Sequence, residues 1–159
     1  MAAKVLSELS NDLKAFGKKV KKDVTRIKRE TARQALSGLI MRSPVHSGDY
    51  VRSNRVGITK NTSGRGVGLG YHTSPGNKWL MAKHPHPWKL KLDLYAKKKL
   101  RISAAKFEDT IVIYNNIPYA DTVEYIGWEL TPAYHPFGHT INFMNIKFPI
   151  IVKTEGIIA

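Results

Sequence analysis

The sequence contains no cysteine, which excludes a disulfide scaffold, thiol catalysis and every cysteine-ligated zinc or iron site. It has neither the apolar run of a signal peptide nor a stretch near the roughly 20 apolar residues of a membrane span. Acidic residues are few, since 12 Asp and Glu stand against 26 Lys and Arg in 159 residues, a net charge of +14. We therefore expect one soluble, strongly basic domain, with or without an arm, whose partners are polyanions or acidic protein surfaces.

Spacings typical of phosphate binding or catalysis are also missing. The glycine-rich stretch 64–70 (GRGVGLG) has the spacing of neither phosphate-binding loop. No serine lies in a Gly-x-Ser-x-Gly elbow. Asp121 and Glu124 stand three residues apart, which is more typical of a solvated helix face than of acid–base catalysis. We expect no catalytic residue and no enzyme activity.

The histidines do not have the spacing of metal ligands. His84 and His86 are separated by proline, and no carboxylate lies near them in the sequence. His135 and His139 lack a third ligand. We expect neither a metal site nor a cofactor.

Residues 4–41 contain no proline and a single glycine, Gly17. Apolar residues recur there every three or four positions, and on a helix turning about 100° per residue they share an arc of about 80°. These residues are Leu6, Leu9, Leu13, Phe16, Val20, Val24 and Ile27. The pattern predicts a long amphipathic helix with basic residues around the rest of its circumference, most of them solvated.

The apolar pattern changes sides beyond Glu30. The later apolar residues Ala32, Ala35, Leu36, Leu39 and Ile40 fall nearly opposite the first seven. Either the chain bends near Glu30, or one half of a straight helix packs on its own domain and the other on a neighbouring subunit. Both alternatives make residues 1–42 a basic amphipathic arm, and we predict that the first seven apolar residues form a subunit interface.

Residues 43–159 form the second part of the chain, and their patterning predicts an α+β fold. Trp88, Leu90, Leu92 and Leu94 alternate with polar residues, which favours a strand over 88–95. We also expect strands over 50–59, 66–71 and 107–114, a short helix over 118–128 and a helix from Thr140 onward, which Pro149 would interrupt. The predicted fold has a long N-terminal helix, an antiparallel sheet and a C-terminal helix.

A dense basic run follows the predicted strand at 88–95. It consists of Lys97, Lys98, Lys99 and Arg101. We expect these residues at the end of a sheet hairpin, either as a solvated loop or facing DNA in a lumen.

Two segments carry a resemblance to a known family. Residues 43–53 (SPVHSGDYVRS) resemble a Pro-Val-Asp-Thr-Gly-x-Leu-Arg-x-Ser segment of the tail-completion and neck proteins of tailed bacteriophages. Residues 113–128 (IYNNIPYADTVEYIGW) resemble the Asn-Asn-x-Pro-Tyr-Ala and Leu/Val-Glu-Tyr-Gly signature of the same family, which includes lambda-like minor tail protein Z. The motif positions are Pro44, Ser47 (threonine in the family), Gly48, Arg52, Pro118, Tyr119, Ala120, Glu124 and Trp128, and the resemblance implies structural roles for them.

The resemblance implies a structural protein of the virion. Such proteins form homo-oligomeric rings, expected here as a hexamer, at the tail–head junction. The ring would join the tail terminator and tail tube to the head-side connector and pass DNA through its lumen without sequence specificity. It would be assembled in the host cytoplasm, with no membrane and no small-molecule substrate. The alternative, from the residues alone, is a nucleic-acid-binding module that acts through the basic N-terminal helix.

Overall fold

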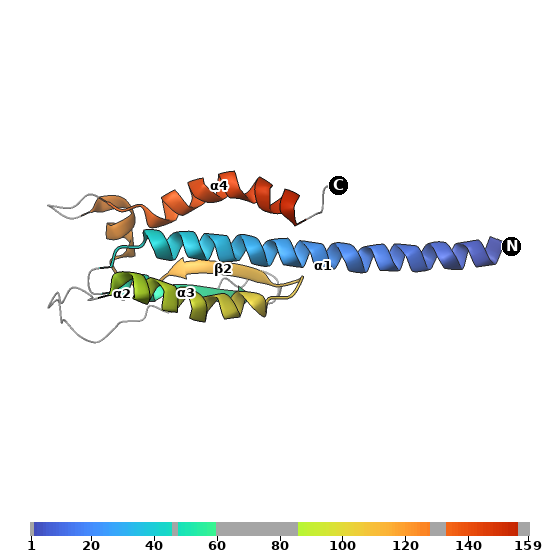
Figure 1. Ribbon diagram of the computed structural model, residues 1–159, viewed down its shortest axis with the longest axis horizontal. Coiled ribbons are helices and arrows are strands. Elements are labelled where there is room, and N and C mark those ends of the chain that lie inside the picture. The colour runs from blue at the N-terminus through green and yellow to red at the C-terminus, as the bar shows by residue number, and fades with distance from the viewer. Residues whose placement is uncertain (1, 46–47, 60–85, 128–132, 156–159) are drawn as a thin grey trace.

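The computed structural model describes residues 2–45, 48–59, 86–127 and 133–155 (Figure 1). In chain order the elements are α1 (Ala2–Arg42), α2 (Asp49–Ser53), β1 (Asn54–Thr59), α3 (Pro87–Ser103), β2 (Thr110–Asn115), the short π-helix η1 (Thr122–Ile126) and α4 (Pro136–Thr154). The predicted α+β fold, with a long N-terminal helix, an antiparallel sheet and a C-terminal helix, is confirmed.

Helix α1 is continuous from Ala2 to Arg42, so the alternative of a bend near Glu30 is wrong. Its C-terminal half lies between α4 on one side and the layer of α3 and the sheet on the other (Figure 1). Its N-terminal half projects beyond the end of both layers. One helix therefore serves both as the centre of the packed body and as an arm outside it.

The core forms where α1, α3 and the sheet meet. Helix α1 contributes Ala32, Leu36 and Ile40, which share one face because they are four residues apart. They pack in one buried cluster with Val51, Val56 and Ile102. The second set of apolar residues in α1 thus packs on its own domain.

The sheet consists of β1 and β2, paired antiparallel from Asn54 opposite Asn115 to Thr59 opposite Thr110. The predicted strand over 50–59 is correct only from Asn54 onward. The preceding residues form α2, which begins after Gly48 in the left-handed conformation (φ 89°). The predicted strand over 107–114 corresponds to β2, shifted by a few residues because a turn closed by the Lys106 N–H and the Asp109 carboxylate occupies its start.

The strand predicted over 88–95 is wrong, since these residues begin α3. Leu90 and Leu94 pack against the core, and their spacing of four residues fits a helix as well as it fits alternation. The other two apolar residues of the pattern, Trp88 and Leu92, are 68% and 56% exposed. Pro87 at the first turn and a run of Leu, Lys and Ala without β-branched residues favour the helix.

The basic run 97–101 consequently lies within α3, not at the end of a hairpin. Lys97, Lys99 and Arg101 are exposed, and the Lys99 ammonium lies 5.7 Å from the centre of the Tyr95 ring. The Lys98 side chain turns toward the sheet.

The last two elements agree with the sequence in outline. The expected short helix over 118–128 appears as η1, and the expected C-terminal helix begins earlier than Thr140, at Pro136, and continues through Pro149. The strand predicted over 66–71 lies outside the described residues.

Candidate interaction surfaces

The two segments that carry the family resemblance meet through a chain of hydrogen bonds at one end of the sheet. The Ser43 hydroxyl donates to the Leu39 carbonyl (2.7 Å) and accepts from the Asn54 amide (2.9 Å). The Asn115 amide donates to the Asn54 side-chain oxygen (2.8 Å) and to the Tyr50 carbonyl (3.0 Å). This chain ties the end of α1 to the start of β1 and the end of β2.

Glu124 has a defined role, and it is not the solvated helix face expected from the sequence. Its carboxylate is buried and accepts hydrogen bonds from the main-chain N–H groups of Phe137 (3.0 Å) and Gly138 (2.7 Å). These are among the unpaired donors at the N-terminus of α4, where the helix dipole favours a negative charge. Burial raises the pKa of the neighbouring Tyr50, and the charge of Glu124 raises it further.

The other motif residues are distributed around this end of the molecule. Pro44 and Ala120 are half-buried, Pro118 and Arg52 are exposed, and Gly48 is buried. Burial, and then the charge of Asp49, raises the pKa of Tyr119 to about 12. Asp49 also lies 3.8 Å from the Arg52 guanidinium. Ser47 and Trp128 lie outside the described residues.

Most of the predicted subunit-interface residues are exposed in the single chain. We call six of them the arm stripe: Leu6, Leu9, Leu13, Phe16, Val20 and Val24, with exposed fractions from 38% to 66%. The seventh predicted residue, Ile27, is already buried by its own chain. A row of large apolar side chains in water indicates a surface that binds another molecule.

The basic residues of α1 fall into two groups. Lys14, Lys18, Lys19 and Lys22 are exposed on the projecting half, as expected for a solvated face. Nearer the body, the Lys28 ammonium donates to the carbonyls of Lys106, Phe107 and Asp109. The Arg29 guanidinium donates to the Ala105 carbonyl. The second group therefore holds the turn between α3 and β2.

The Lys98 side chain is also structural. Its ammonium donates to the Arg52 carbonyl (2.9 Å) and to the Asn54 carbonyl. Burial, followed by the nearby Arg55 charge, lowers the pKa of Lys98 to about 8. Of the four residues predicted to face DNA, Lys98 thus points toward its own sheet, and the Arg101 guanidinium also donates to the Val56 carbonyl of β1 (3.4 Å).

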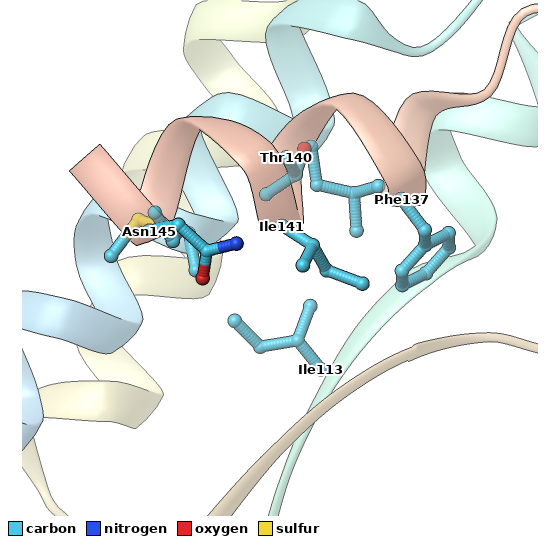
Figure 2. A pocket seen from close by; sticks show the side chains of 8 residues that line it. Ile113, Phe137, Thr140, Ile141 and Asn145 are labelled. Atoms are coloured by element: carbon cyan, nitrogen blue, oxygen red, sulfur yellow. The ribbon is translucent and has the colours of Figure 1, made fainter. Parts of the chain in front are cut away.

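An apolar cleft of about 210 Å³ lies between α4, β2 and the C-terminal half of α1 (Figure 2). In Figure 2, Ile113 of β2 faces Ile141 of α4 across the cleft. The remaining lining residues are Ala35, Leu39, Phe137, Thr140, Met144 and Asn145. None of the lining residues is charged, so the cleft suits apolar side chains and offers no group for acid–base catalysis.

Within the described parts of the chain, no three His, Asp or Glu side chains come close enough together to hold a metal ion. His135 and His139 stack edge to face with ring centres 6.0 Å apart. Among the described helices, none is both long and apolar enough to cross a membrane. Searches against family models, curated proteins and solved structures found no match.

The sequence analysis missed the cleft and the bond between Glu124 and α4. A signal for the cleft is the composition of α4, where only Lys147 and Lys153 are fully charged between Pro136 and Thr154. A helix that is apolar on several sides needs more than one packing partner. Residues outside the described ranges separate Glu124 from α4 in the sequence, and no local spacing of residues predicts their contact.

Proposed function

We propose that this protein is a structural component of a tailed-phage virion, a tail-completion or neck protein at the tail–head junction. Copies of the chain assemble into a homo-oligomeric ring, and the ring joins the tail side to the head-side connector. DNA passes through the ring without sequence-specific contacts. The proposal assigns no catalysis and no cofactor to the chain.

The arm stripe is the observation that carries this proposal. Six large apolar side chains are exposed along one side of a helix that projects from a packed body. When another molecule covers such a surface, the complex is stabilised by about 25 cal/mol for each Å² of apolar area removed from water. The motif resemblance supports the same function, because the two matching segments adjoin in space and because Asn115 and Glu124 make structural contacts there.

The test is the oligomeric state of the purified chain without nucleic acid. Native mass spectrometry and sedimentation should find a closed ring. Virions purified from infected cells should contain the chain in their neck. A chain that stays monomeric at every concentration, and is absent from virions, would contradict the proposal.

A second candidate is a nucleic-acid-binding module, which the exposed lysines of α1 favour. Lys14, Lys18, Lys19 and Lys22 would contact phosphates, and each contact releases about 0.9 counterions, so the affinity falls steeply with salt. In this case the free chain would be monomeric and would bind DNA of any sequence. Replacing the four lysines by glutamine would abolish binding under the second candidate and leave ring assembly intact under the first.

A further inference from the structure

Helix α4 carries an apolar surface that its own chain leaves partly uncovered. We call it the α4 strip: Phe137, Ile141, Met144, Phe148 and Val152, which recur every three or four residues and share one side of the helix. Ile141 is 59% exposed and Phe148 is 47% exposed. Phe137, Ile141 and Met144 of the strip line the cleft in Figure 2. Within the described residues, the arm stripe and the α4 strip are therefore both apolar surfaces that another molecule could cover.

Within one chain, α1 already packs against α4. A Cβ at Gly38 would lie 3.4 Å from the Thr140 methyl, and the Arg42 guanidinium lies 4.8 Å from the centre of the Phe143 ring. At about 100° per residue, Gly38 and Arg42 fall within about 40° of the centre of the arm stripe. The arm stripe therefore continues the side of α1 that accepts α4 in the body.

The arm cannot reach the strip of its own chain. Helix α1 is straight, and the end of α4 lies beside Arg26, whose guanidinium pairs with Glu155 (2.6 Å). From there the arm runs on, away from α4 (Figure 1). Only the arm of another copy can lie along the strip.

Length permits this pairing, and charge favours it over the pairing of two arms. The arm stripe spans about 27 Å and the α4 strip about 22 Å at 1.5 Å per residue. From Leu6 to Arg26 the arm has six basic and three acidic residues, so two arms side by side would bring two positive segments together. The only fully charged side chains of α4 are those of Lys147 and Lys153, and both lie outside the strip.

We infer that the arm stripe of one copy packs on the α4 strip of the next copy, with its side chains in the cleft between α4 and β2. The inference rests on the proposed homo-oligomer and adds which two surfaces meet. Because the two surfaces differ, the contact is heterologous, and its repetition closes a ring or extends a filament. The mode is that of an amphipathic helix in an apolar groove.

The absence of cysteine in the chain makes disulfide cross-linking a direct test. Phe16→Cys places a thiol on the arm stripe, and Ile141→Cys places one on the α4 strip. The two single variants, one with a mass tag, are mixed, oxidised and separated without reductant. We expect a cross-link between the two variants, and a ladder of covalent multimers from the double variant Phe16→Cys/Ile141→Cys.

Lys18→Cys is the matched control, because Lys18 is exposed on the opposite side of the same helix turn. Paired with Ile141→Cys, it should give no cross-link. Dominant cross-links between two Phe16→Cys copies, or equal cross-linking by Lys18→Cys, would overturn the inference. When one of these contradicting results is found, the oligomeric state of the reduced protein shows how much fails. If the reduced protein is an oligomer, the inference fails and the proposed ring stands. If it is monomeric, the proposed ring fails as well.

Discussion

At the scale of single residues, the side-chain hydrogen bond between Asn54 and Asn115 forms in only one alignment of the two strands. Both side chains are at the same end of the sheet, opposite each other, and the amide of one donates to the side-chain oxygen of the other. A slip of one strand by one residue would turn its Asn side chain to the other face and separate it from its partner. The buried Asn54 and the half-buried Asn115 would then lose the hydrogen bond between their side chains.

Replacing Asn115 tests this role. Asn115→Ala leaves the Asn54 side-chain oxygen and the Tyr50 carbonyl without their donor. We expect the free energy of unfolding to fall by about 1–3 kcal/mol, measured by denaturant titration. The control is Asn142→Ala on the exposed side of α4, which should change it by less than about 0.5 kcal/mol. Equal effects of the two substitutions would contradict the role.

Lys98 predicts a pH dependence of stability. Its pKa is about 8 in the folded chain, and its ordinary value is 10.5. Between these two pH values the unfolded chain holds a proton that the folded chain has released, so stability from this group rises as the pH rises. Denaturant titrations of the wild type and Lys98→Met should show the difference in unfolding free energy growing in favour of the wild type from pH 8 upward. A constant or shrinking difference would exclude the lowered pKa.

At the scale of the elements, α4 depends on a residue from outside itself. The side chain of His135, the N-cap residue of α4, makes no hydrogen bond to the first turn of the helix. The Glu124 carboxylate accepts the hydrogen bonds of that turn instead. Capping of this kind is worth about 0.5–2 kcal/mol. The orientation of α4 on the body thus depends on η1.

Glu124→Ala should therefore destabilise the protein by about 0.5–2 kcal/mol, and Glu124→Gln should cost less because it keeps one oxygen acceptor. Thermal and denaturant unfolding measure both effects. Asp121→Ala is the control, because Asp121 is exposed three residues earlier on the same segment. If Glu124→Ala costs no more than Asp121→Ala, the capping role is wrong.

The elements also show what local patterning can predict. The seven apolar residues of α1 spaced three or four apart fit only a helix, and they predicted it correctly. Leu90 and Leu94 fit both periods over a short window, and the exposure of Leu92 between them distinguishes the helix from the strand. The cleft could not be predicted, because Ala35, Ile113 and Ile141 come together only through the packing of α1, β2 and α4.

At the scale of the whole molecule, the proposed assembly and the folding of the body would depend on different residues. The Leu13 and Phe16 side chains are 62% and 65% exposed, so they contribute little to the stability of the single chain. Leu13→Asp/Phe16→Asp should abolish assembly in sedimentation experiments and leave the unfolding transition of the body in place. Asn11→Asp/Ala15→Asp makes the same change of charge on the opposite side of the helix. Assembly by the first variant, or loss of assembly by both, would refute the role of the stripe.

The net charge of +14 predicts a sign for the effect of salt on assembly. Copies of one basic chain repel one another, and salt screens this repulsion, so added salt should strengthen self-association. Binding to DNA responds in the opposite way. Sedimentation across a salt series measures the first effect, and DNA titration across the same series measures the second. Self-association that weakens with salt would contradict assembly through the apolar stripe.

The projecting half of α1 should also make a free chain sensitive to proteolysis. A helix segment of this length without tertiary contacts is only marginally stable in water, and Gly17, Val20 and Val24 reduce its stability further. Local opening of such a segment admits proteases, and its lysines are the residues that trypsin cleaves after. Cleavage after Lys18 to Lys22 would remove most of the arm stripe and spare the core of the body. An arm covered by a neighbouring copy would be protected, so proteolysis would distinguish free chains from assembled ones.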